Sequence, residues 1–212
     1  MDDPAVQATD RDMMQRCIAL SATSSEHGEY PYAAVICRDG RVVIETLNRV
    51  ARDGDVTRHA EVVALSAAQK ALGRTSLDDC TIYVNAEPCA FCSYAIRESR
   101  IARVVYGLRS PHMGGLSKWN ILADEDIATA MPEVFAPPPE IVAGLLWQEA
   151  EQVCRKWNPV FWEFVKRRGL FAGFPPEQRG PVELASLRRD GPWQRLLTAL
   201  RTFVFDRFGR NR

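Results

Sequence analysis

The sequence predicts a layered α/β domain built around a mostly β core. Helix-like and strand-like segments alternate along the first half of the chain, and a hairpin signal joins two of the strands. The composition, 46% hydrophobic and 25% charged, is that of a globular protein. It excludes a disordered chain, a collagen-like repeat and a disulfide miniprotein. The 212 residues allow one domain, with or without appendages.

The first predicted elements are a helix and a β-hairpin. Asp10 can cap a helix whose apolar side chains recur at helical spacing over residues 13–22. The segments 32–37 and 41–46 are strand-like, and the Asp39-Gly40 pair between them is a strong hairpin signal. A polar loop is expected after this hairpin.

Helices and strands then alternate as far as residue 106. The pattern predicts a helix over 60–72, a buried strand over 80–85, a helix over 88–99 and a strand over 102–106. Gly73 closes the first of these helices, and Pro88 suits the first turn of the second.

After Gly107 the pattern weakens. We expect a loop over 109–120, helices over 124–130, 140–157 and 158–168, a linker over 171–180 and a further helical stretch over 182–208. The chain is therefore divided into a catalytic domain, residues 1–130, and a helical C-terminal extension, residues 131–212. The extension is expected to pack on the core or on a partner subunit.

Two short motifs carry the chemistry, and each opens a predicted helix. His59 and Glu61 begin one helix, and Cys89 and Cys92 begin another. One imidazole and two thiolates are three good ligands for Zn²⁺, and they leave a fourth position for water. A helix N-terminus favours thiolates through its dipole and its free N–H groups. Glu61, beside the metal but not bound to it, can then take a proton from that water.

Other interpretations of these residues stay open. Cys89 and Cys92 could form a redox pair, although this leaves His59 and Glu61 unexplained. A structural zinc site would need a fourth ligand. The remaining cysteines are expected to be small buried hydrophobic residues: Cys17, Cys37, Cys80 and Cys154.

Together, the His-x-Glu and Pro-Cys-x-x-Cys motifs resemble the zinc-dependent cytidine/deoxycytidylate deaminase superfamily. Over roughly residues 10–125 the chain is most similar to the branch of guanine, cytosine and tRNA-adenosine deaminases. That branch places a substrate-binding Asn eleven residues before the metal-binding His, and Asn48 stands at this distance from His59. Ala33 replaces a Gly that is usual in the branch, which is expected to narrow the space beside the substrate. The resemblance implies a three-layer α/β/α fold with a central mixed five-stranded sheet.

The resemblance also implies hydrolytic deamination and a role for each site residue. Glu61 removes a proton from the nucleophilic water and returns protons to the ring nitrogen and to the leaving ammonia. Asn48 hydrogen-bonds the polar edge of the ring, and the backbone around Ala86 and Glu87 receives the leaving amine. Further candidate contacts to substrate are Ala60, Tyr32 and Trp119. Packing roles for the two aromatic residues stay open, and so does closure of the pocket by an aromatic residue of the C-terminal helices.

The net charge of zero is the sum of two unequal segments. Residues 1–154 carry 14 basic and 22 acidic side chains, whereas residues 155–212 carry 13 basic and 5 acidic ones. A basic segment suggests an anionic partner. However, apolar side chains recur at helical period between Trp193 and Val204, which favours an amphipathic helix that packs on the protein or a partner subunit. Nucleic-acid contact and binding to a membrane surface are the alternatives.

The function expected first is deamination of a free nucleobase or small amino-heterocycle, guanine-like or cytosine-like. The alternatives are a tRNA-adenosine deaminase, a nucleoside deaminase and an inactive zinc protein used as a binding module. The acidic body disfavours a tRNA-binding face, and the long segment after Tyr106 suggests a covered pocket. A location in the cytoplasm is expected, because the chain has no apolar run of about 18 residues and no apolar signal core. The resemblance to the deaminase family implies a homodimer.

Overall fold

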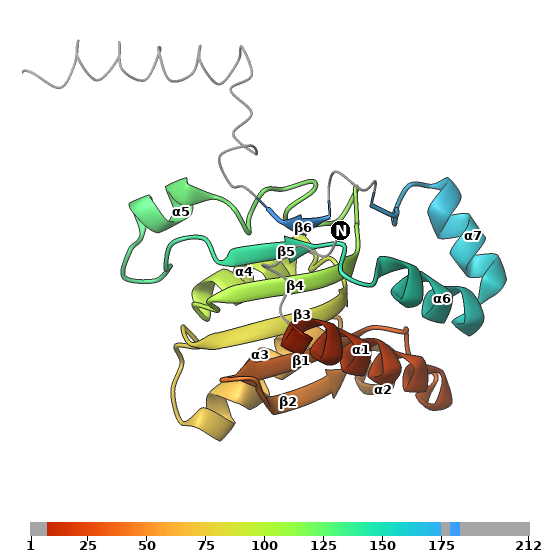
Figure 1. Cartoon of the computed structure of the whole chain (residues 1–212), viewed down its shortest axis with the longest axis horizontal. Coiled ribbons are helices and arrows are strands. Elements are labelled where there is room, and N and C mark those ends of the chain that lie inside the picture. The colour runs from red at the N-terminus through yellow and green to blue at the C-terminus, as the bar shows by residue number, and fades with distance from the viewer. Residues whose placement is uncertain (1–7, 175–178, 183–212) are drawn as a thin grey trace, which may run out of the picture. The chain divides into compact units, whose positions relative to one another are not determined.

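The computed structural model describes residues 8–174 and 179–182, and these contain one mixed β-sheet between helices. The strands lie side by side in the order β2-β1-β3-β4-β5-β6 (Figure 1). Their bounds are β1 (Ala33–Arg38), β2 (Arg41–Leu47), β3 (Cys80–Ala86), β4 (Arg103–Leu108), β5 (Glu140–Ala143) and β6 (Gly180–Pro181).

The pairing of the strands brings the functional loops to one edge of the sheet. Strand β1 is antiparallel to β2 and β3, whereas β3, β4 and β5 run parallel to one another. The end of β3, the end of β4 and the start of β1 therefore lie at the same edge. The two-residue β6, antiparallel to β5, adds a sixth strand to the five expected.

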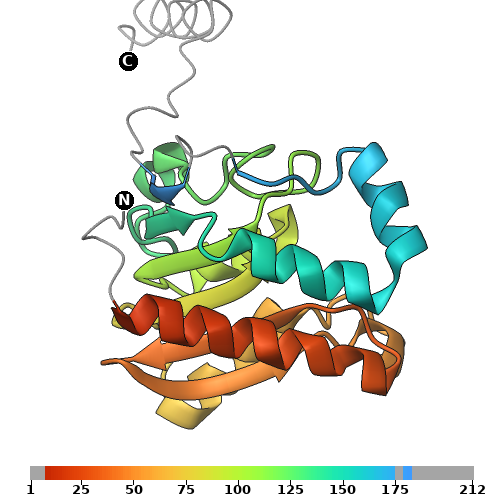
Figure 2. The ribbon, with the colours of Figure 1, turned by 45° about the vertical axis from the view of Figure 1, so that its right-hand side comes forward.

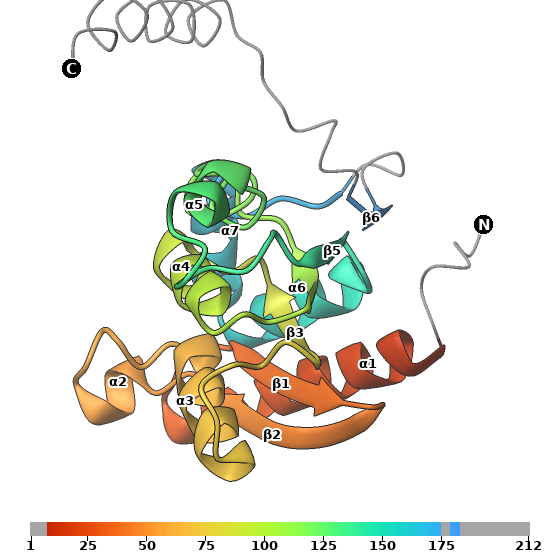
Figure 3. The ribbon, with the colours of Figure 1, turned by 90° about the vertical axis from the view of Figure 1, so that its left-hand side faces the viewer.

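Helices cover both faces of this sheet. Their bounds are α1 (Ala8–Ala22), the 3₁₀-helix η1 (Thr23–His27), α2 (Val50–Asp53), α3 (Ala60–Leu72), α4 (Ala90–Glu98), α5 (Glu125–Ala130), α6 (Trp147–Trp157) and α7 (Pro159–Arg167). Helices α1 and α6 pack on one face and on each other (Figure 2), and α3 and α4 lie on the opposite face (Figure 3). The predicted three-layer α/β/α arrangement is confirmed.

The hydrophobic core lies on both sides of the central strands. In β1 and β4 every residue but one is buried, because helices cover the sheet above and below. The hairpin strand β2 at the edge is only partly buried. Helix α3 ends at Gly73 in the left-handed conformation (φ 65°), as predicted.

Two local predictions were wrong. Asp10 does not cap a helix, because α1 begins at least two residues earlier, and its buried carboxylate instead bonds Arg103 and Tyr83. The helix predicted from residue 140 begins only at Trp147. Residues 140–143 form a strand that pairs with β4 instead. The sequence did not reveal this strand, because four residues next to a long amphipathic helix show no period of their own.

The described residues belong to one compact unit, which ends at Val182 and so contains part of the predicted C-terminal extension. Strand β5 and helix α6 thus pack on the same sheet as the deaminase-like motifs. The amphipathic helix expected between Trp193 and Val204 lies outside the described residues. Among the described residues, no helix is long and apolar enough to span a membrane.

Candidate active site

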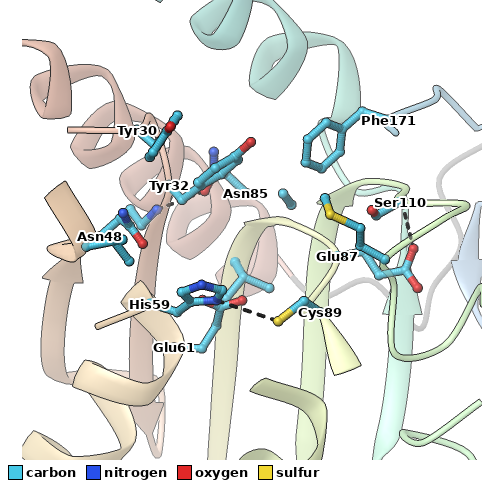
Figure 4. A pocket seen from close by; sticks show the side chains of 15 residues that line it. Tyr30, Tyr32, Asn48, His59, Glu61, Asn85, Glu87, Cys89, Ser110 and Phe171 are labelled. Atoms are coloured by element: carbon cyan, nitrogen blue, oxygen red, sulfur yellow. Dashed lines mark hydrogen bonds between the residues drawn. The ribbon is translucent and has the colours of Figure 1, made fainter. Parts of the chain in front are cut away.

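Three metal-binding side chains meet where two helices begin. His59 directly precedes α3, Cys89 directly precedes α4, and Cys92 lies in the first turn of α4. His59 Nδ1 is 3.6 Å from Cys89 Sγ (Figure 4). It is 3.3 Å from Cys92 Sγ, and the two sulfur atoms are 3.6 Å apart. Tetrahedral zinc, with bonds of about 2.3 Å to sulfur and about 2.0 Å to nitrogen, would hold such donors about 3.5–3.8 Å apart. The donor set therefore fits a zinc ion.

The surroundings of Cys89 favour its thiolate form. A hydrogen bond from Cys92 lowers the pKa of Cys89 to about 4 against the effect of burial, and His59 and the Cys92 backbone N–H add to this shift. The same hydrogen bond, together with burial, raises the pKa of Cys92. The pKa of His59 is raised by its hydrogen bond to Cys89. The cluster thus stabilises a thiolate at the helix N-terminus, which is the form that binds metal.

Glu61 lies in the first turn of α3, beside the metal-binding group but outside it. Burial raises the pKa of this carboxyl to about 7, and the negative charge of Cys89 adds to the shift. Glu61 also lines the cavity that opens next to the metal ligands. Glu61 therefore lies beside both the metal ligands and the cavity, a position that is compatible with the predicted proton transfer.

A cavity of about 160 Å³ lies beside the metal ligands and has two unlike sides. We call the side formed by His59, Glu61 and Cys89 the metal wall. The aromatic wall lies opposite and is formed by Tyr30, Tyr32 and Phe171 (Figure 4).

The rings of the aromatic wall form one continuous group. The ring centroid of Tyr32 is 6.5 Å from that of Tyr30 and 6.0 Å from that of Phe171. Such rings offer flat apolar surface on which a planar heterocycle can stack. The prediction that Tyr32 lines the pocket is thus matched by its position.

The other predicted substrate contacts are divided between cavity and core. Asn48, directly after β2, and Ala86, at the end of β3, line the cavity. Ala33 lines it as well, so the residue that replaces the usual Gly lies at the cavity. Ala60, the first residue of α3, is 1% exposed and is not among the described lining residues.

Glu87 lines the cavity, but its carboxylate binds a neighbouring loop. It accepts hydrogen bonds from the backbone N–H groups of Ser110, Leu116 and Ser117, at 2.7, 3.1 and 2.6 Å. A Cβ atom added at Gly114 would lie only 2.1 Å from Glu87 Oε1, so this close wrapping of the loop requires glycine. Glu87 therefore holds in place the loop that forms part of the cavity wall.

Trp119 lies outside the cavity, in contrast to the expectation. Its side chain is 57% exposed, and Lys118 Nζ lies 5.9 Å from its ring centroid. The reason is a backbone turn, in which the Trp119 N–H donates to the Gly114 carbonyl. From this loop, Ser110 and Met113 reach the cavity instead.

Several lining residues were not found from the sequence. Tyr30, Val50, Asn85 and Phe171 carry no motif, and Phe171 falls in a segment predicted to be a linker. Asn85 ties the end of β3 to the start of β1, because its side chain accepts from Ala33 N and donates to the Pro31 carbonyl. The only feature of the sequence that could have indicated a role for Asn85 was its place in a strand predicted to be buried.

Comparison with known proteins supports the same assignment. The model of the cytidine and deoxycytidylate deaminase zinc-binding region matches residues 7–108. A tRNA-specific adenosine deaminase from Agrobacterium fabrum is 31% identical over 144 residues, which cover 68% of this chain and 90% of that protein. A guanine deaminase from Bacillus subtilis is 45% identical over 94 residues, covering 44% of this chain and 60% of that protein.

One matching protein is much longer than this chain. A tRNA(Ile)-lysidine synthase from Deinococcus radiodurans is 33% identical over 174 residues, but the chain spans only 28% of its length.

Among solved structures, one from a study of A-to-I editing by tRNA:A34 deaminases superposes with a TM-score of 0.59 at 31% identity. The match covers 67% of this chain and 99% of that one. With its His-Cys-Cys site at the starts of α3 and α4, the chain belongs to the zinc-dependent cytidine/deoxycytidylate deaminase family.

Proposed function

We propose that the protein catalyses the hydrolytic deamination of a free nucleobase or small amino-heterocycle, such as guanine or cytosine, and releases ammonia. The family membership supports the reaction type. The choice of a small substrate rests on the shape of the site.

The observation that carries this choice is the position of Phe171. This residue follows α7, far along the chain from the motifs, yet it lines the cavity together with Tyr32. Its ring also stacks on Trp162 of α7, at a centroid distance of 5.8 Å, so the wall has support behind it. Residues beyond 130 thus cover part of the site, and a covered site suits a compact substrate.

The proposed chemistry assigns proton transfer to Glu61. Zinc, when bound, supplies a nucleophile derived from water at neutral pH. The Glu61 carboxylate accepts the proton released as the water oxygen bonds to the ring carbon. It passes this proton to the ring nitrogen, takes the second proton from the hydroxyl group now bonded to the ring carbon, and delivers it to the exocyclic amine. The C–N bond then breaks as the hydroxyl becomes a carbonyl, and ammonia is released.

The remaining groups bind and orient the ring. Asn48 hydrogen-bonds the polar edge of the heterocycle, and the backbone at Ala86 and Glu87 receives the amine as it leaves. The aromatic wall holds the ring plane against the metal wall and excludes water from it. Asn48→Ala is expected to weaken substrate use while zinc content stays unchanged.

A second candidate is deamination of adenosine in tRNA. It is favoured by the match to a tRNA-specific adenosine deaminase, most of whose length this chain covers. That activity requires a nucleotide flipped out of the nucleic acid into the cavity.

The deciding experiment is ammonia release from the zinc-loaded protein with three groups of substrates: free bases, nucleosides and a tRNA anticodon stem-loop. Turnover of guanine or cytosine alone supports the proposal. Turnover confined to the stem-loop replaces it with the second candidate, and binding to tRNA should then fall steeply with salt.

We also propose that the protein pairs with a second copy of itself. Two aromatic side chains of α4, Phe91 and Tyr94, are 49% and 44% exposed beside the metal-binding cysteines. Light scattering of the wild type and of Tyr94→Ser tests this. A monomeric wild type would contradict it.

A further inference from the structure

A buried carboxylate that the proposed mechanism does not use, Glu29, lies next to the cavity. Glu29 is placed between η1 and β1 and is 1% exposed. One carboxylate oxygen accepts a hydrogen bond from Asn48 Nδ2 at 2.8 Å and from Tyr30 N at 3.1 Å. The other accepts from the backbone N–H groups of Ala51 and Arg52, at 3.0 and 3.1 Å.

These contacts connect Glu29 to one side chain of the site and to the backbone of the short helix beside it. Asn48 lines the cavity, and so does Val50, which belongs to α2 together with Ala51 and Arg52. Asn48 is also fixed through its backbone, because its N–H donates to the Tyr32 carbonyl at 2.9 Å. Glu29 therefore lies behind the lining residue rather than among the groups that face the cavity.

An ionised carboxylate can only accept hydrogen bonds, so it determines which way the Asn48 amide points. Burial alone would raise the pKa of Glu29, but hydrogen bonds from Arg52 N, Asn48 and Ala51 N outweigh it and lower the pKa. The amide nitrogen of Asn48 must then face Glu29, since the amide oxygen would meet a second acceptor. The order of donor and acceptor that Asn48 shows to a bound ring is thereby fixed.

We propose that Glu29 is a positioning residue for the substrate, which holds the Asn48 amide in the single orientation that matches the polar edge of the base. This inference rests on the proposed function of the site. Fixed polar groups discriminate strongly, because a ring with the opposite order of donor and acceptor leaves them unpaired. Glu29 would thus contribute to substrate choice without touching the substrate.

The test is a double-mutant cycle between Glu29→Gln and Asn48→Ala in the zinc-loaded protein, with guanine and cytosine as probes. Glu29→Gln keeps the shape of the side chain but leaves one acceptor oxygen instead of two, so Asn48 is released. Each single variant should keep its zinc and lose about 10- to 100-fold in kcat/KM, as is common for groups that orient a ligand-binding side chain. The double variant should be no worse than Asn48→Ala alone, because Glu29 acts through Asn48.

A buried carboxylate elsewhere provides the matched control. Asp10 is 2% exposed and bonds Arg103 and Tyr83, outside the described lining of the cavity. Asp10→Asn combined with Asn48→Ala should give losses that multiply. If the losses of Glu29→Gln and Asn48→Ala also multiply, Glu29 has only a structural role and the inference is overturned.

A stability measurement tests the contact between Glu29 and Asn48 independently of catalysis. Asn48→Asp should lower the unfolding temperature more than Asn48→Ala does, because two buried carboxylates then face each other. Adding Glu29→Gln to Asn48→Asp should recover most of that loss, since the introduced amide can donate to the introduced carboxylate. No recovery overturns the contact, whereas a wild type inactive on every substrate overturns the proposed function itself.

Discussion

The metal wall and the aromatic wall of the cavity are built in different ways. His59 and Glu61 are neighbours at the start of α3, and Cys89 is separated from Cys92 by a single helical turn. The aromatic wall joins Tyr30 and Tyr32 to Phe171, which follows α7. The catalytic side chains are thus placed by short spacings within two motifs, whereas the side chains that contact the ring are placed by tertiary packing. Substitutions in the two walls should therefore have different effects on activity.

The largest effect is expected from Cys89→Ala in the metal wall. Loss of one thiolate from a three-ligand set should abolish zinc binding and turnover, and lower stability because metal binding and folding are coupled. Metal analysis and thermal unfolding measure both.

Cys37→Ala is the matched control, because Cys37 is a cysteine of β1 that lies outside the metal-binding group. It should keep full zinc. A Cys89→Ala protein with unchanged zinc stoichiometry would remove Cys89 from the ligand set.

Glu61→Gln should separate metal binding from catalysis within the same wall. The amide keeps the shape of the side chain but cannot accept and return a proton, so kcat should fall about 10²- to 10⁴-fold with zinc retained. Ammonia release and metal content are measured on one preparation. Wild-type turnover would exclude Glu61 from proton transfer.

The metal wall could be predicted from the sequence because its ligands need fixed spacing at helix starts. His59, Cys89 and Cys92 were found in this way, and the structure brings their donor atoms together. The hairpin of β1 and β2 was equally local, since Asp39-Gly40 marks its turn. Features that depend on residues close together in the sequence, such as the metal ligands and the hairpin, were therefore predictable.

Of the aromatic wall only Tyr32 was predicted, because long-range contacts place Phe171 and the residues that support it. Phe171 reaches the cavity only after α6 and α7 have packed, and Trp119 is directed away by a backbone bond to Gly114. Glu29 precedes β1 in a loop with no periodicity, and its role follows only from its distance to Asn48. Strand β5 was missed since four residues are too few to show a period.

Glu29→Gln should reveal the ionised carboxylate through the pH dependence of stability. Because the folded protein lowers the pKa of Glu29, its contribution is present above the ordinary Glu value of about 4.3 and is lost as pH falls through the lowered value. The wild type should exceed the variant by about 2 kcal/mol in free energy of unfolding at pH 7, and by less in acid. Urea unfolding across pH 3–7 measures this.

Glu98 on α4 is exposed, so Glu98→Gln is the control that shows how a change from Glu to Gln at an exposed position affects stability across this pH range. A gap between wild type and Glu29→Gln that widens as the pH falls would contradict a lowered pKa.

Phe171→Leu tests whether the aromatic wall contacts the ring. The change keeps an apolar side chain but removes ring stacking worth about 1 kcal/mol, so KM for a free base should rise about fivefold with little change in kcat. Phe164→Leu on α7 is the control, since that ring is 53% exposed. Equal KM values in both variants would show that Phe171 supports the fold and not the substrate.

Trp119→Ala should have the smallest effect, and it distinguishes the two substrate classes. The ring is exposed and lies outside the cavity, so kinetics with a free base should stay within about twofold of wild type. An exposed indole beside Lys118 is also a surface on which an unpaired base of RNA can stack. A loss seen only with the tRNA stem-loop would therefore favour the second candidate function, because only a large substrate reaches beyond the cavity. A loss of about fivefold with a free base would instead show that the loop moves Trp119 into the site during turnover.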